Sequence, residues 1–341
     1  KRGAMSQKLK IVVPMAGLGT RLRPQTWSRP KQLIRLAEKS ALGHVLDMFD
    51  TLPDTQSVEF IFIIGYLGDK VREYMTEVYP DLDVHYVVQE EMRGQSHALY
   101  LAREHLTGPM LMVFADTLIE TDLSFIDDEE SDIVAWVKPV PDPRRFGVAE
   151  VGQDGWVTRL IEKPKSMDNN MAVVGFYYFK DGESVVAAIE EQIQRDIKLK
   201  SEYFLADAIN IMLENEETKM RTEKVDIWLD AGTPEAVLET NAYLLENGHD
   251  NSAKVSERPG IRVISPVYVH PDATVEVSVL GPHVAIGPGC HVQNSVIRNS
   301  IIEKNSEAKN VILRDTLIGQ NSQVRGQSVV VNLGDHCKVE I

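Results

Sequence analysis

Cysteine is nearly absent from this sequence, and no apolar run is long enough to span a bilayer. The only cysteines are Cys290 and Cys337, and their spacing indicates neither a zinc site nor a disulfide framework. The strongest apolar runs, such as 60–64, fall far short of the roughly 18 to 20 residues that a membrane helix needs. No secretory leader is visible, and residues 1–5 resemble a remnant of expression. We therefore expect a globular protein of the reducing cytoplasm.

Positive charge is also scarce, since the chain has 36 lysines and arginines against 51 acidic residues and a formal net charge of -15. This balance argues against a nucleic-acid-binding surface, which would carry a basic face or stripe. The exception is the start of the chain, where no acidic residue precedes Glu38. Five basic residues fall there within 15 positions: Arg21, Arg23, Arg29, Lys31 and Arg35. A solvated basic loop would explain the run alone, but its glycine-rich setting favours an anion site.

The length of 341 residues exceeds the roughly 250 to 300 that one hydrophobic core supports, so we expect two domains. Strand-like apolar runs at 9–14, 58–64, 84–88, 110–115 and 133–137 alternate with helical patterns at 40–49 and 95–106. After Asp142 short strands mix with helices near 203–213 and 234–245. This pattern predicts an α/β, Rossmann-like domain with a mixed sheet over residues 6–250.

Residues 259–341 carry an internal repeat. Aliphatic residues recur there at steps of five or six: Val269, Val275, Leu280, Ile286, Val292, Ile297, Ile302, Ala308, Leu313, Ile318 and Val324. Each short side of a β-helix buries one such residue, and the intervening Gly, Asn, Asp and Ser suit tight corners. The repeat predicts a short left-handed parallel β-helix, which is better suited to assembling subunits than to catalysis.

A glycine-rich segment follows the first predicted strand and reads Gly17-Leu18-Gly19-Thr20-Arg21-Leu22-Arg23-Pro24. Glycines at such a place allow backbone N–H groups to approach a phosphate closely. Two familiar phosphate loops are excluded. A Walker loop requires Gly-Lys-Ser/Thr after four residues, and a dinucleotide fingerprint requires a third glycine where Leu22 stands.

This segment and the following Pro30-Lys31-Gln32 instead resemble the nucleoside-triphosphate loop of the sugar-1-phosphate nucleotidyltransferases. Further matching elements stand in the order of that family: Gln89 with Arg93-Gly94 and His97-Ala98, Phe114-Ala115-Asp116, Phe146-Gly147-Val148, Glu162-Lys163-Pro164, Val174-Gly175-Phe176-Tyr177, Glu202 before Asp207, and Trp228-Leu229-Asp230-Ala231-Gly232-Thr233. The matched elements run from about residue 10 to 247. With its β-helix, the chain is most similar to long-form glucose-1-phosphate thymidylyltransferases.

The resemblance implies a reaction in which a nucleoside triphosphate and a sugar-1-phosphate form a nucleotide sugar and pyrophosphate. The implied catalytic cations are Arg21, Lys31 and Lys163. The implied nucleotide-binding residues are Ala16, Gly17, Gly19, Thr20, Gln32, Gln89 and Gly94. The implied sugar-phosphate-binding residues are Gly147, Glu162, Gly175, Tyr177 and Glu202. Asp116 and Asp230 would hold Mg²⁺, which prefers carboxylate and phosphate oxygens.

Other functions remain open at the level of the sequence. Thymidine or uridine triphosphate with glucose-1-phosphate is the expected substrate pair; uridine triphosphate with N-acetylglucosamine-1-phosphate and guanosine triphosphate with mannose-1-phosphate are alternatives. A non-catalytic regulatory homologue should have lost Arg21, Lys31, Asp116 or Asp230, and all four are present. An additional acyltransferase activity is disfavoured because the repeat allows only about four coils. We expect a homo-oligomer that binds neither membranes nor nucleic acid.

Overall fold

The computed structural model describes residues 8–53 and 57–327, and the chain divides into two compact units. Unit 1 comprises the residues up to 34 together with 40–236, and unit 2 comprises 35–39 together with the residues from 237 onward. The outer ends of the two predicted domains, residues 6–7 and 328–341 with Cys337, lie outside the described residues. Within the described part of the chain, no helix has the length and apolar character needed to cross a membrane.

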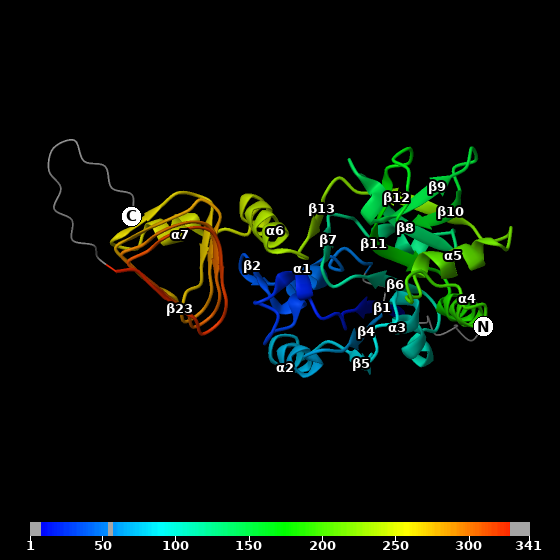
Figure 1. Cartoon of the computed structure of the whole chain (residues 1–341), viewed down its shortest axis with the longest axis horizontal. Coiled ribbons are helices and arrows are strands. Elements are labelled where there is room, and N and C mark those ends of the chain that lie inside the picture. Colours follow the sequence, from blue (N-terminus) through cyan, green and yellow to red (C-terminus); the bar gives the residue numbers. More distant parts are fainter. Residues whose placement is uncertain (1–7, 54–56, 328–341) are drawn as a thin grey trace. The chain divides into compact units, whose positions relative to one another are not determined.

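Unit 1 is built on a nine-stranded mixed sheet (Figure 1). Its main path runs β10-β9-β11-β6-β1-β4-β5, and β8 pairs with both β11 and β12. The strands are β1 (Leu9–Pro14), β4 (Val58–Ile64), β5 (Val84–Val88), β6 (Met110–Val113), β8 (Ile133–Pro139), β9 (Gly147–Val151), β10 (Val157–Glu162), β11 (Met171–Phe179) and β12 (Met220–Lys224). Strands β6, β1, β4 and β5 are parallel, whereas β11 is antiparallel to β6, β8 and β9. The predicted α/β class with a mixed sheet is confirmed.

Both faces of the sheet are covered, which explains why β6, and β1 and β4 after their second residues Lys10 and Glu59, are apolar rather than alternating. On one face, Val12 and Ile61 share a buried cluster with Leu99, Ile189 and Leu205 from three helices. On the other face Phe49 contacts Phe60 and Phe176, with ring centroids 6.0 and 6.1 Å apart.

The helices of unit 1 fill the connections between strands. They are α1 (Ala41–Asp47), α2 (Gly68–Val78), α3 (Gln95–Leu101), α4 (Gly182–Gln194) and α5 (Leu205–Leu213). As predicted, Ser40 caps α1, because its hydroxyl accepts a hydrogen bond from the Gly43 N–H at 3.0 Å. The prediction of one helix over 95–106 is wrong at its end: α3 stops at Leu101, and a 3₁₀ turn, η3 (Arg103–His105), follows. This tighter turn keeps both Ala102 and Leu106 buried.

Short elements complete unit 1 beside the ends of the parallel strands. Strands β7 (Thr117–Ile119) and β13 (Trp228–Asp230) form an antiparallel pair in which Asp230 lies opposite Thr117. The 3₁₀ turns are η1 (Thr20–Leu22), η2 (Lys31–Leu33), η4 (Ser124–Asp128) and η5 (Pro143–Arg145). Asp116 directly precedes β7, and Asp230 is the last residue of β13, so this pair places Asp116 and Asp230 on neighbouring backbone segments.

Unit 2 is a parallel β-helix whose coils lie over one another (Figure 1). Its helices are α6 (Pro234–Glu246), which begins at the end of unit 1, and α7 (Ser252–Ser256). A six-stranded sheet contains β14 (Ile261–Val263), β15 (Val267–Val269), β17 (Ser278–Leu280), β18 (Val284–Ile286), β20 (Val296–Ile302) and β22 (Ile312–Ile318). A four-stranded sheet contains β16 (Thr274–Glu276), β19 (His291–Gln293), β21 (Glu307–Lys309) and β23 (Gln323–Arg325).

The repeat residues predicted from the sequence form the core of this β-helix. Nine of them are buried, and Leu313 and Val324 pack against them. Asparagines occupy left-handed corners, as at Asn294 (φ 47°) and Asn310 (φ 55°), and the two side chains hydrogen-bond between coils at 3.2 Å. Asparagine tolerates this backbone region better than other non-glycine residues. The β-helix prediction is confirmed.

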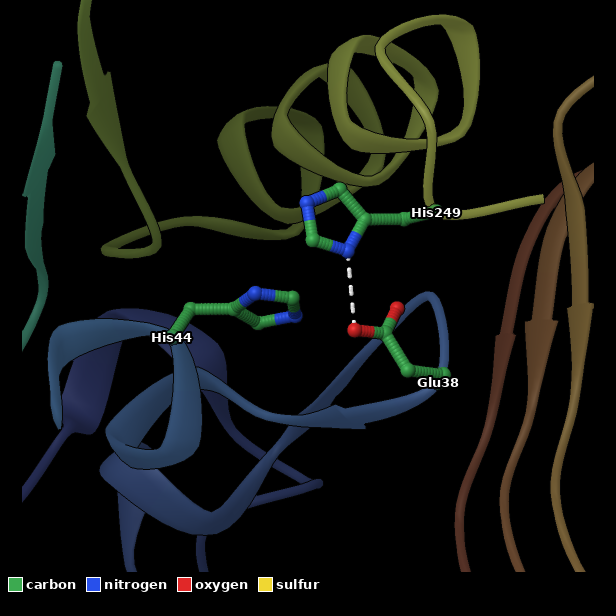
Figure 2. A group of neighbouring side chains, drawn as sticks. All are labelled: Glu38, His44 and His249. Carbon is green, nitrogen blue, oxygen red and sulfur yellow. Dashed lines mark hydrogen bonds and ion pairs between the residues drawn. The ribbon is translucent and has the colours of Figure 1, made fainter. Parts of the chain in front are cut away.

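The segment 35–39 belongs to unit 2 through polar contacts. The Arg35 N–H donates to Glu303 Oε1 at 2.9 Å, and the Ala37 N–H donates to Asn241 Oδ1 at 2.9 Å. The His249 ring Nδ1 lies 2.8 Å from Glu38 Oε1 (Figure 2). These contacts satisfy backbone groups that would otherwise be buried without partners.

Candidate active site

The glycine-rich segment leaves the carboxyl end of β1 and turns sharply into η1. Gly19 adopts a left-handed backbone (φ 61°), and its carbonyl accepts hydrogen bonds from the Leu22 N–H at 3.0 Å and the Thr26 hydroxyl at 2.7 Å. Ala16 is buried beneath the turn, whereas Gly17 and Thr20 are exposed. The Gln32 side chain is buried and donates to the Met15 carbonyl at 3.3 Å. The turn therefore exposes part of its backbone to solvent, while the hydrogen bonds to the Gly19 carbonyl hold its conformation.

Two cations and two carboxylates meet beside this turn. Lys31 Nζ forms an ion pair with Asp116 Oδ2. A Cβ added at Gly232 would lie 2.9 Å from both carboxylate oxygens of Asp230 and 3.0 Å from Arg21 Nη2, so these two side chains flank the same backbone position. Burial raises the pKa of Asp230, and the Asp116 charge raises it further, while Lys31 and Arg21 lower it. The site thus gathers negative charge that a cation would relieve.

A small cavity of about 280 Å³ opens over the glycine-rich turn. Its lining includes seven of the residues that the sequence singled out: Gly17, Gly19, Thr20, Arg21, Lys31, Gln32 and Asp116. The glycine-rich turn and two cationic side chains border it, while Asp116 is its carboxylate. Such a lining suits an anion with several phosphates.

A larger cavity of about 600 Å³ shares Arg21, Phe114 and Asp116 with the small one. Its lining contains further residues that the sequence singled out: Gly147, Glu162, Gly175, Tyr177 and Asp230. Because the two linings have these three residues in common, the cavities meet at Arg21 and Asp116. A ligand in each would therefore come together beside the carboxylate pair.

One wall of the larger cavity carries the acidic side chain Glu162. The residue ends β10 and pairs with Gly147 of β9, where an added Cβ would lie 3.1 Å from Glu162 Oε2. Burial raises the pKa of Glu162, and the nearby carboxylates Asp207 and Glu202 raise it as well. Lys163 lowers it, since Lys163 Nζ lies 3.5 Å from Glu162 Oε1. The same ammonium lies 4.3 Å from the centre of the Phe204 ring.

The opposite wall is formed by β11 and the residues after β6. Gly175 has φ 85°, and a Cβ there would overlap the Phe114 ring. The backbone N–H of Phe114 donates a hydrogen bond to the Gly175 carbonyl at 3.1 Å. Tyr177 is buried, and burial together with the Glu162 charge raises the pKa of its hydroxyl well above the ordinary range. This hydroxyl therefore stays protonated and able to donate a hydrogen bond at physiological pH.

A separate group of residues lies between β5 and α3. Gln89 follows β5 and is buried, and its amide nitrogen lies 3.4 Å from the Gly94 carbonyl and 3.5 Å from His97 Nδ1. Burial lowers the pKa of His97, with a smaller contribution from Arg93. Gly94 has φ 101°, and an added Cβ would lie 2.5 Å from the backbone N and O of Tyr203. Only glycine fits at this position.

The structure does not place every predicted residue in a cavity lining. Ala16, Gln89, Gly94, Lys163 and Glu202 are outside both linings. Conversely, Arg145 and Gln95 line the larger cavity although the sequence reasoning assigned them no role. Arg145 directly precedes Phe146-Gly147, so its position beside a matched motif was the available signal.

Trp228 also lines the larger cavity, beside Phe146, with ring centroids 5.0 Å apart and an interplanar angle of 65°. The two aromatic rings add apolar surface to a lining that also contains carboxylates, which suits a ligand with both apolar and hydroxyl faces.

An α/β sheet with two neighbouring cavities, one of them over a glycine-rich turn with cations beside it, suits an enzyme that handles phosphorylated ligands. The family of nucleotidyl transferases matches residues 10–247, and this chain belongs to it. It is a sugar-1-phosphate nucleotidyltransferase by family, with a β-helix added after that region.

Three comparisons place this chain among characterised relatives. It is 28% identical to glucose-1-phosphate thymidylyltransferase of Streptomyces antibioticus, covering 98% of this chain and 99% of the relative. It is 27% identical to the bifunctional protein GlmU of Methanococcus maripaludis, covering 95% and 74%. A solved structure of UDP-glucose pyrophosphorylase complexed with UDP-glucose covers 70% of this chain and 99% of its own, with 19% identity and a TM-score of 0.58. This last likeness concerns the fold alone.

Proposed function

We propose that this enzyme joins thymidine or uridine triphosphate to glucose-1-phosphate and releases pyrophosphate. The observation that carries the proposal is the junction of the two cavities, where Arg21 and Asp116 border both. One cavity has the backbone N–H groups and cations that a triphosphate requires, and the other has the carboxylate and hydroxyl that sugar hydroxyls can bind. The reacting phosphates would meet between them.

The triphosphate would lie over the glycine-rich turn. Ala16, Gly17, Gly19 and Thr20 supply the backbone of that turn, and Gln32 supports it from below through Met15. Arg21 and Lys31 would neutralise the phosphates and stabilise the charge that builds on departing pyrophosphate. Gln89 and Gly94 would contact the base, because an amide offers one acceptor and two donors to the N3–H and a carbonyl of thymine or uracil.

The sugar phosphate would occupy the larger cavity. Glu162 and Tyr177 offer hydrogen-bonding groups to the sugar hydroxyls, and Gly147 and Gly175 leave room for the ring. Lys163 would hold the phosphate, and Glu202 would border the sugar from the side of Glu162, whose charge it influences. Lys163 stands outside the lining, 3.5 Å from Glu162 Oε1, so a modest change of its side-chain torsions would be required.

Asp116 and Asp230 fit a magnesium ion. Both offer carboxylate oxygens, the ligands that this cation prefers, and burial together with the Asp116 charge raises the pKa of Asp230. When bound, the ion would neutralise phosphate charge and so lower the repulsion between the two substrates. Lys31 already compensates Asp116 through its ion pair, and Arg21 lies beside Asp230.

The chemistry is a single displacement at phosphorus. An oxygen of the sugar phosphate attacks the α-phosphorus, a new O–P bond forms, and the bond to the β-phosphate bridging oxygen breaks in line. The nucleophile is already anionic, so no side chain has to remove a proton. The role of the protein is therefore to position the two substrates and to stabilise charge, with Arg21 and Lys31 on the leaving side and Lys163 on the attacking side.

A pyrophosphate-release assay across a matrix of triphosphates and sugar phosphates tests the substrate assignment. We expect the highest kcat/KM with thymidine or uridine triphosphate and glucose-1-phosphate, in the presence of Mg²⁺. Preference for uridine triphosphate with N-acetylglucosamine-1-phosphate would move the assignment to that alternative pair. A higher kcat/KM for guanosine triphosphate with mannose-1-phosphate than for either pyrimidine would overturn the proposal, and so would the absence of release with every pair.

We further propose that unit 2 joins copies of this chain. A ladder of outward-facing aliphatic side chains supports this role: Val279, Val296 and Ile312 are paired strand to strand in consecutive coils. Val296 and Ile312 are 43% and 83% exposed. Aligned exposed β-branched residues on a flat parallel sheet are typical of a surface that a second copy covers.

A further inference from the structure

A second polar cluster lies in unit 1 at the opposite edge of the parallel strands. Lys10, Glu59 and His85 are each the second residue of their strands, β1, β4 and β5. The residues proposed for catalysis follow the last residues of the same strands, as Ala16 and Gln89 do. Since β1 spans six residues at roughly 3.3 Å each, the cluster lies about 20 Å from the proposed phosphate turn. It therefore has no part in the reaction described above.

Strand register gathers these side chains on one face. Lys10 lies directly opposite Glu59, and His85 lies opposite Ile61, two residues further along β4 and thus on the same face as Glu59. Lys10 Nζ donates to Glu59 Oε2 at 2.9 Å, and His85 Nε2 lies 2.9 Å from Glu59 Oε1. The Glu59 carboxylate is therefore held from both sides and only 13% exposed.

His105 completes the cluster from the turn that follows α3. Its backbone is fixed because η3 is anchored between the buried residues Ala102 and Leu106, with the His105 N–H donating to the Ala102 carbonyl at 2.9 Å. The His105 ring stacks on that of His85, with centroids 4.7 Å apart and an interplanar angle of 29°. One ligand atom each from Glu59, His85 and His105 lies within 4.8 Å of the others.

We propose that Glu59, His85 and His105 bind one divalent transition-metal ion of the Zn²⁺, Co²⁺ or Ni²⁺ class. Two imidazole nitrogens and one carboxylate oxygen form a donor set that these ions prefer and that Mg²⁺ does not. Lys10 fixes the carboxylate by its far oxygen, as outer partners of metal ligands commonly do. His85 is 42% exposed, so solvent can supply the remaining ligands. The ion would tie η3 to strands β4 and β5.

Cobalt binding tests this site, because Co²⁺ in a nitrogen and oxygen site has visible absorption that reports its coordination. The full-length protein, freed of metal by a chelator, is titrated with Co²⁺ in excess Mg²⁺, and bound equivalents are counted by equilibrium dialysis. We expect His105→Ala and His85→Ala each to bind one equivalent of Co²⁺ fewer than the wild type and to lack the visible absorption of that ion. The matched control is His291→Ala, which removes an exposed imidazole from β19 in unit 2 and should lose nothing.

Circular dichroism and nucleotidyl transfer in Mg²⁺ establish that each variant is folded, since neither histidine belongs to the proposed catalytic machinery. If His105→Ala fails to fold, the Co²⁺ titration is made with His105→Asn and His85→Ala instead. Equal Co²⁺ equivalents in the wild type and in folded His105 and His85 variants would overturn the proposal. Displacement of the bound Co²⁺ by Mg²⁺ would overturn it too, because it would mean a site of oxygen ligands only. Zn²⁺ should raise the unfolding temperature of the wild type more than that of the His105 variant.

Discussion

At the scale of single residues, the two carboxylates at the junction of the cavities have different surroundings. Asp116 has an ion pair with Lys31, whereas the pKa of Asp230 is raised by burial and by the Asp116 charge. A raised folded-state pKa means that the folded protein favours the protonated acid. Stability associated with that protonation is therefore present at low pH and lost as pH rises through the raised pKa.

It follows that Asp230→Asn should stabilise the ligand-free protein at neutral pH while abolishing most of its activity. The amide removes the cost of an ionised buried carboxylate, and an unfolding temperature higher by on the order of 2 to 4 °C would correspond to about 1 kcal/mol. The gain should shrink as pH falls through the raised pKa. Thermal unfolding at several pH values and kcat in saturating Mg²⁺ are the measurements.

The control for this substitution is Asp69→Asn, because the Asp69 side chain is 97% exposed on α2. It should change neither the unfolding temperature nor kcat. Full activity of Asp230→Asn in limiting Mg²⁺ would contradict the metal assignment, and a loss of stability at neutral pH would contradict the pKa argument.

Gln89 offers a second prediction at this scale. Its amide is the group proposed to match the edge of a pyrimidine, and sites that hydrogen-bond a substrate can discriminate by factors on the order of 10⁴. Gln89→Ala should lower kcat/KM for thymidine and uridine triphosphates together and narrow the gap to purine triphosphates. Steady-state kinetics with four triphosphates measure this, and an unchanged ratio of pyrimidine to purine kcat/KM would exclude Gln89 from base recognition.

At the scale of elements, the start of α3 depends on a close backbone contact. Gly94 precedes the helix with φ 101°, and the Tyr203 backbone occupies the space that a Cβ would need. Gly94→Ala should therefore destabilise unit 1 and raise KM for the triphosphate, because both the left-handed strain and the overlap displace the segment that carries Gln95 and His97.

Gly155→Ala separates the effect of left-handed backbone strain from the effect of the overlap with the Tyr203 backbone. Gly155 also has a positive φ, 87°, but no atom lies within 4 Å of its added Cβ. It should show only the backbone strain, on the order of 1 to 2 kcal/mol, and an unchanged KM. Equal losses of unfolding temperature in the two variants would mean that the contact with Tyr203 contributes nothing.

Sequence patterns predicted the parallel strands well, because β1, β4 and β6 are covered on both faces and so are mostly apolar, apart from Lys10 and Glu59 near the starts of β1 and β4. They did not predict β10, whose residues alternate irregularly between buried and exposed since it lies at the edge of the sheet. The repeat of unit 2 was evident because each short side of a coil buries one aliphatic residue, which gives steps of five or six along the sequence.

For the candidate site, the glycine-rich turn and the carboxylates stand at strand ends, where a sequence can be interpreted by local pattern. Arg145 could not be assigned in this way, because only the pairing of β9 with β10 and the turn η5 bring it to the larger cavity. The joining of the two cavities at Arg21 and Asp116 also depends on pairing between β7 and β13, which are separated by more than a hundred residues. Such long-range contacts have no local signal.

At the scale of the whole molecule, assembly and chemistry should be separable. Ile312→Glu places a charge on the exposed ladder of unit 2 and should lower the mass of the protein in solution, measured by light scattering, while kcat changes little. Gln320→Glu, a charge at another exposed position of the same unit, is the control and should leave the mass unchanged.

Ending the chain near Glu257 should likewise alter the oligomer and leave measurable activity. A wild type that is monomeric would contradict the assembly proposal.

The central claim is that an oxygen of the sugar phosphate attacks the α-phosphorus between the two cavities. Phosphorus NMR of a mixture of the protein, thymidine triphosphate, glucose-1-phosphate and Mg²⁺ tests it most directly, because every phosphorus in substrates and products is observed. The account predicts equal amounts of a nucleoside diphosphate sugar and pyrophosphate, formed by the wild type and almost absent with Asp230→Asn. Formation of thymidine monophosphate or inorganic phosphate without the sugar diphosphate would contradict it, since that outcome is hydrolysis and not transfer.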